Sequence, residues 1–148
     1  MLKFRFTLAR LGFIVLFIAL TMVQILSFPG QFAYMRKTQG ISLLFEVILT
    51  LTVGLWIACG QFAIVCLWKI LRLMQNNQFY TKTSIKWIDW LMFIFKLASF
   101  MAIVLFLLIA SVADDPGILV VLSVLSLIVF SLTLTVSLLR DQIELKLS

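Results

Sequence analysis

The side chains that most often carry out chemistry in proteins are scarce in this sequence. It has no histidine and two cysteines, Cys59 and Cys66, which lie seven residues apart in one apolar run. On a helix this spacing puts both thiols on one face, but too far apart to bridge each other. Without histidine or a cysteine cluster, there is no zinc or iron–sulfur ligand set. We therefore expect no metal and no cofactor.

Four other polar side chains lie within or near apolar segments: Glu46, Gln61, Asp89 and Lys96. An ionisable group in a membrane span is costly and is by default a functional candidate. Lys96 either contacts a partner or ligand, or leans toward the N-terminal end of its helix to reach water. Asp89 lies two turns earlier on the same face, which favours an Asp89–Lys96 relationship. Glu46 lies near a helix start, where the dipole stabilises a carboxylate.

Two adjacent carboxylates, Asp114 and Asp115, precede Pro116. Such a pair could meet a cation. The alternative, which we favour, is that Asp115 caps a helix with Pro116 at its first position. Elsewhere we find no nucleophile beside a base and no phosphate-binding loop, so we do not expect an enzyme.

The elements that hold these residues are expected to be membrane-spanning helices. Residues 41–68 form an apolar run with one charged side chain, Glu46, and no proline. About 20 such residues cross the ~30 Å hydrocarbon core as a helix. Over the whole chain, 64% of residues are hydrophobic and 12% are charged, as in polytopic membrane proteins. The sequence predicts an all-α fold, a single membrane domain forming a four-transmembrane-helix bundle, with spans over roughly residues 11–28, 43–68, 88–112 and 117–139.

Local signals predict where these helices begin and end. Phe28-Pro29-Gly30 should end the first, because proline cannot continue the hydrogen-bond ladder and Pro-Gly favours a turn. Ser42 can cap the second helix. Asn76-Asn77 can end it, since asparagine tolerates the left-handed conformation. The third helix can start at Thr81, Thr83 or Ser84.

The positive charges indicate an orientation. With four spans, two of the twelve Lys and Arg residues lie in the first connection, Arg36 and Lys37. Nine lie on the opposite side, with both termini: Lys3, Arg5, Arg10, Lys69, Arg72, Lys82, Lys86, Arg140 and Lys146. Positive flanks stay cytoplasmic, so both termini are expected in the cytoplasm. The net charge of +6 then reflects topology, and we expect no direct contact with nucleic acid.

The longest polar stretch, residues 69–86, is the best candidate for an interaction surface. Phe79 and Tyr80 lie there among cations, where an aromatic side chain either anchors a partner or lies among lipid headgroups. The charged tail lies on the same side. The predicted partner-binding face comprises Lys69, Arg72, Asn76, Asn77, Phe79, Lys82, Lys86, Arg140, Asp141 and Glu144.

These features resemble a known family. The segment ILRLMQNNQFYTKTSIKWIDW, the four-span layout and ADDPG before the last span resemble the bacterial family catalogued as domain of unknown function 2975. The family's turn more often has a residue between the second aspartate and the proline, whereas here Asp115 abuts Pro116. The resemblance implies a small protein of the bacterial cell membrane, without assigned enzyme activity and often encoded beside a helix-turn-helix regulator. The layout is also similar to membrane inhibitors paired with LytTR-type regulators.

Three functions follow as hypotheses. The first is an inhibitor that sequesters a cytoplasmic DNA-binding transcription regulator at the membrane by mass action. The second is an immunity protein against a membrane-active peptide or bacteriocin. The third is a small transporter or channel subunit, with Gln61, Lys96 and the last span's hydroxyls as its polar lining. Gly54 and Ala58 have a small-xxx-small spacing that lets helices approach closely, which is compatible with a homo-oligomer.

Overall fold

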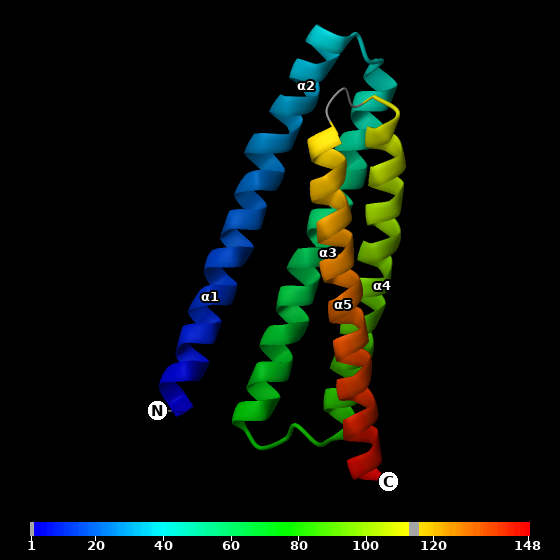
Figure 1. The fold of residues 1–148 in the computed structure, drawn as a ribbon. Coiled ribbons are helices and arrows are strands. Elements are labelled where there is room, and N and C mark those ends of the chain that lie inside the picture. Colours follow the sequence, from blue (N-terminus) through cyan, green and yellow to red (C-terminus); the bar gives the residue numbers. More distant parts are fainter. Residues whose placement is uncertain (1, 113–115) are drawn as a thin grey trace.

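The computed structural model describes residues 2–112 and 116–148, so Asp114 and Asp115 lie outside the described residues. The described chain is helical and without strands. Four helical rods are long and apolar enough to cross a membrane, which confirms the predicted all-α membrane fold. The elements are α1 (Leu2–Met22), the π-helix η1 (Val23–Ser27), α2 (Phe28–Gln39), α3 (Leu43–Gln75), α4 (Lys82–Ala110) and α5 (Pro116–Leu147) (Figure 1).

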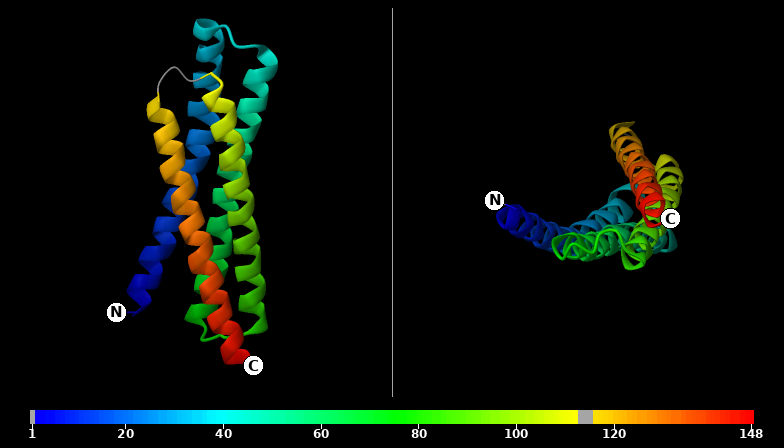
Figure 2. Two further views of the ribbon diagram at one scale, coloured as in Figure 1. Left: turned by 45° about the vertical axis from the view of Figure 1, so that its right-hand side comes forward. Right: turned by 90° about the horizontal axis from the view of Figure 1, so that it is seen from below.

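The four rods form a curved row rather than a closed ring. Seen along its length, α3 lies between the first rod and α4, and α5 packs against α4 (Figure 2). Over the described residues α1 and α5 do not pack against each other. Toward its N-terminus α1 lies beside α3 and away from α5 (Figure 1). Both termini and residues 76–81 lie at one end of the bundle, which we call the basic end.

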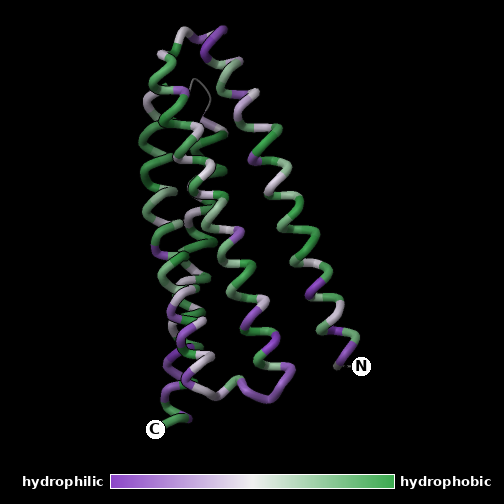
Figure 3. The backbone as a smooth tube through the Cα atoms, turned by 180° about the vertical axis from the view of Figure 1, so that it is seen from behind, coloured by the Kyte–Doolittle hydropathy of each residue, from purple (hydrophilic) through white to green (hydrophobic). Residues whose placement is uncertain are grey.

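Apolar side chains fill two clusters between the rods. One, toward the basic end, joins α3, α4 and α5 and includes Cys66, Ile88 and Ile143. The other joins α2, α3 and α4 and includes Phe32 and Leu49. Most remaining apolar side chains are exposed, and the middle of each rod is mainly hydrophobic (Figure 3). Such an outer surface suits lipid rather than water.

Three predicted helix ends are confirmed. The Ser42 hydroxyl accepts a hydrogen bond from the Phe45 amide at 3.2 Å and caps α3. Thr81 caps α4 by accepting from the Ser84 amide at 3.4 Å. At the end of α3, Asn77 has φ +57°, and the Gln78 amide donates to the Leu73 carbonyl at 2.9 Å. With the Asn77 amide bonded to Met74, this is a Schellman motif.

The prediction that Phe28-Pro29-Gly30 ends the first helix is wrong. The rod continues through η1 into α2 and ends at Gly40, which has φ +68°. The Phe28 amide donates to the Val23 carbonyl, one residue further back than in an α-helix. This wider π turn lies directly before Pro29, which has no amide to donate and would clash with an α-helical ladder. The turn thus absorbs the proline without breaking the rod.

Candidate interaction face at the basic end

Arg140 is the centre of an ion-pair cluster between α4 and α5. Its Nε donates to Asp89 Oδ1 at 2.6 Å and its guanidinium donates to Glu144 Oε2 at 2.8 Å. Asp141 lies 3.8 Å away. The cluster exists because α5 continues as a helix past the predicted end at residue 139, to Leu147. The four groups are held as one charged patch across the two helices.

Asp89 therefore forms an ion pair with Arg140, and the prediction that Asp89 interacts with Lys96 is wrong. Lys96 lies two turns further along α4, is exposed, and has no hydrogen bond or ion pair within the described residues. Arg140 reaches Asp89 from the neighbouring helix, and a bond at 2.6 Å leaves Asp89 no need for a partner two turns away. The exposed position of Lys96 fits a side chain extending along lipid-facing surface.

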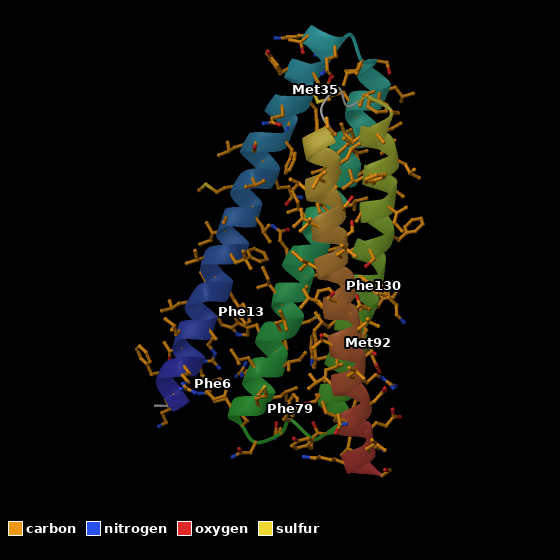
Figure 4. The ribbon with its side chains drawn as sticks, in the orientation of Figure 1. Phe6, Phe13, Met35, Phe79, Met92 and Phe130 are labelled. Carbon is orange, nitrogen blue, oxygen red and sulfur yellow. The ribbon has the colours of Figure 1, made fainter. Side chains whose placement is uncertain are left out.

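The two adjacent aromatics of the loop have different environments. Phe79 is half-buried and packs against the core cluster at the end of the bundle (Figure 4). Tyr80 is exposed, with its ring edge-on to Phe79. The Lys146 ammonium lies 4.2 Å from the Tyr80 ring centroid and donates to its hydroxyl at 3.1 Å. Tyr80, rather than Phe79, is thus the aromatic available to a partner.

The loop that presents Tyr80 is fixed by one carbonyl. The Gln78 oxygen accepts from the hydroxyls of Thr81, at 2.8 Å, and Ser84, at 3.0 Å. Ser84 is fully buried. These hydrogen bonds and the contact of Lys146 with Tyr80 were not predicted from the sequence. The Thr-x-x-Ser spacing at the start of α4 could have indicated the hydrogen bonds. Bonds of this kind hold a short loop in one conformation.

The other predicted face residues divide between two sides of the basic end. Asn76, Asn77, Lys82 and Lys86 are exposed at the loop and the start of α4. Lys69 is exposed on α3, with its ammonium 5.8 Å from the Trp87 ring centroid. Arg72 lies one turn further along α3 and is exposed. The described face therefore has one side, at α4 and α5, that contains ion pairs, and another side, at α3, whose charged residues are all cations.

The polar groups within the rods do not gather into one path in the described structure. Glu46 lies 3.0 Å from Arg36 of α2, at ion-pair distance but without hydrogen-bond geometry. Gln61 donates to the Thr21 hydroxyl at 2.9 Å, joining α3 to α1. The Gly54 carbonyl accepts from Gln24 of η1 at 3.2 Å. The α5 hydroxyls donate back to their own helix at Ser123, Ser126, Ser131, Thr133 and Thr135.

Arg10 is a further polar residue that sequence reasoning counted only as a charge. It donates to Gln75 Oε1 at 2.6 Å and lies 5.8 Å from the Trp68 ring centroid. The signal was its place in a stripe of α1 that also contains Phe6, Phe13 and Leu20, at spacings of four, three and seven residues that keep one helix face. This contact ties the end of α1 to the end of α3.

Comparison with known proteins gives one match. A model of the family described as protein of unknown function (DUF2975) matches residues 9–142. No curated protein and no solved structure matches the chain. Within the described residues no three potential metal ligands lie together.

Proposed function

Because the chain belongs to the DUF2975 family of proteins of unknown function, we propose its role from its own surface: it is a membrane protein that docks and sequesters a cytoplasmic DNA-binding regulator. The basic end is the docking face. In this proposal that end faces the cytoplasm of a bacterial cell, in line with the positive-inside rule. Holding the regulator at the membrane keeps it from its operator, and a signal in the membrane shifts the balance.

The observation that carries the proposal is the pre-arranged contact set around Tyr80 and Arg140. Tyrosine and arginine are enriched among residues that dominate binding energy at protein interfaces. Here Tyr80 is held by Lys146, and Arg140 is held by Asp89 and Glu144. Fixed side chains lose less conformational entropy on binding than free ones. A partner with complementary charge and an aromatic-accepting pocket would fit this surface.

Co-purification tests the proposal. The full chain is tagged, extracted in mild detergent, and assayed for the DNA-binding regulator encoded beside its gene. The double variant Tyr80→Ala with Lys146→Gln should bind the regulator about thirtyfold more weakly and recover correspondingly less, since loss of one hot-spot residue costs roughly 2 kcal/mol. The matched control is Tyr34→Ala with Lys37→Gln, an exposed aromatic and a cation near the opposite end.

The control variant should recover as much regulator as the unmodified chain. Deleting the chain should also raise the regulator's occupancy of its operator. Equal recovery of the regulator by both double variants would show that Tyr80 and Lys146 do not belong to the docking face. Unchanged operator occupancy after deletion of the chain would rule out sequestration as the function.

A further inference from the structure

The cations on the α1–α3 side of the basic end lack acidic partners. No Asp or Glu occurs before Glu46 or between Glu46 and Asp89 in the chain. The acids described at this end surround Arg140, between α4 and α5. None of five cations on the other side forms an ion pair within the described residues: Lys3, Arg5, Arg10, Lys69 and Arg72.

An apolar groove runs between α1 and α3 and includes Lys69, one of these cations, in its lining. It has a volume of about 210 Å³ and is lined from residues 13–18 of α1 and 64–69 of α3. Phe13 lies between the two helices (Figure 4). Lys69 lines the groove, with its ammonium 5.8 Å from the Trp87 ring centroid of α4, and Trp68 lies beside it. The groove can therefore take an apolar chain along the helices.

Helical register brings three of the cations to the end of this groove. Arg10 lies one turn before Phe13 and Ile14, and Arg72 lies one turn beyond Trp68 and Lys69. The Arg10 guanidinium contacts the Trp68 ring and Gln75, but its Nε is buried without a hydrogen-bond partner. The guanidinium has no carboxylate partner within the described residues, so its Nη groups, rather than the buried Nε, are the donors that an anion would meet.

We propose that the α1–α3 groove binds one anionic phospholipid. Its phosphate lies among Arg10, Lys69 and Arg72, and one acyl chain lies along the groove. Arginine binds phosphate through parallel hydrogen bonds, and basic pockets between membrane helices suit anionic headgroups. A zwitterionic lipid adds a positive amine that these cations repel, and neither α1 nor the described neighbouring part of α3 has an acid to meet it. Trp68 lies beside Lys69 in the groove lining, and tryptophan is enriched at membrane interfaces.

Native mass spectrometry of the full chain in mild detergent tests this proposal. Phosphatidylglycerol and phosphatidylcholine of equal chain length are added separately, and sn-glycerol 3-phosphate is added as the free headgroup. We expect one retained phosphatidylglycerol, about tenfold weaker retention of phosphatidylcholine, and no retention of glycerol phosphate. A charge-assisted hydrogen bond contributes enough to account for such a ratio.

Two variants probe the headgroup and tail separately. Arg10→Gln should weaken phosphatidylglycerol retention about tenfold, and Val65→Trp should weaken it by filling the groove without changing charge. Lys37→Gln makes the same charge change at the opposite end and should have no effect. Helical content and gel-filtration volume check that each variant is folded.

Three results would each overturn the lipid site. One is equal retention of the two lipids by the unmodified chain. Another is unmodified retention by both folded variants. The third is retention of glycerol phosphate as tight as that of the lipid, which would identify a soluble phosphate ligand instead. The regulator co-purification does not depend on any of these results.

Discussion

Glu46 shows how one side chain is made tolerable inside an apolar rod. Its side chain is 15% exposed, and its carboxylate lies 3.0 Å from Arg36 Nε. Removing the cation leaves a mostly buried carboxylate without an ionic partner. We expect Arg36→Gln to lower the free energy of unfolding by about 1–3 kcal/mol, because a mostly buried charge loses its nearest opposite charge. Equilibrium unfolding in mild detergent measures this.

The matched comparison is Asp89→Asn, which removes an ion pair in which the Asp89 side chain is 47% exposed. Exposed pairs contribute little, so we expect a smaller loss there than for Arg36→Gln. Adding Glu46→Gln to Arg36→Gln should restore part of the lost stability, because the buried charge is gone. An Arg36→Gln variant as stable as the unmodified chain would show that the pair does not stabilise α2 against α3.

At this scale the sequence could identify polar residues but not their partners. Arg140 and Asp89 lie on different rods, so their meeting depends on how α5 packs on α4. The two adjacent aromatics Phe79 and Tyr80 are equivalent by composition. Their opposite environments follow from the bonds that fix the loop and from the core beneath it.

At the scale of the element, the π turn keeps one face of the first rod continuous. The residues of that rod in the second core cluster include Leu20, Phe28, Phe32 and Met35. Leu20 and Phe28 are eight residues apart, which in a regular α-helix with 3.6 residues per turn gives a drift of about 80° around the axis. One extra residue in η1 corrects this drift and keeps all of them against α3. Pro29 makes the regular alternative costly.

Deleting a residue should therefore be tolerated at η1 and not elsewhere. Deletion of Ile25, which is 67% exposed, together with Pro29→Ala should convert the π turn to regular α-helix and keep the inward face. The chain should still form a disulfide between cysteines placed at Thr21 and Gln61, whose side chains meet at 2.9 Å. Cross-linking in native membranes, read by gel mobility after cleavage between the two sites, measures this.

Deletion of Leu55 is the control, because it is 57% exposed but lies in the regular part of α3. It rotates the rest of α3 by about 100°, removing its apolar face from α4, so we expect misfolding and loss of the cross-link. If the Ile25 deletion behaves like the Leu55 deletion, η1 is not a register correction.

Helix ends were predictable where the signal is local. Ser42, Asn77 and Thr81 act through hydrogen bonds or backbone geometry within a few residues. The Pro29 prediction failed because the same dipeptide can end a helix or be accommodated by a π turn. Which one forms depends on whether the following residues pack against α3, and Phe32 does.

At the scale of the whole molecule, hydropathy was enough to predict four rods, but not their arrangement. The number of spans depends on length and composition, which the sequence contains directly. The open row depends on which faces meet. The first rod contacts α3 through the hydrogen bonds of Gln24 and Thr21, and α5 contacts α4 through the Arg140 ion pair. These pairings join residues far apart in the chain, so no local pattern could specify them.

The arrangement makes one prediction about topology that thiol labelling can test. Both termini and residues 76–81 lie at the basic end, whereas Lys37 lies at the end of the first rod furthest from the N-terminus (Figure 1). Cysteines placed at Ser148 and Asn76 should therefore react together with a membrane-impermeant maleimide, and one placed at Lys37 should react alone. The native Cys59 and Cys66 are buried and should react slowly, so they serve as the background. If the basic end is cytoplasmic, the maleimide labels only the Lys37→Cys variant in intact cells and labels all three variants in opened cells. Labelling of Ser148→Cys in intact cells would put the basic end outside the cell and remove the docking face from any cytoplasmic partner.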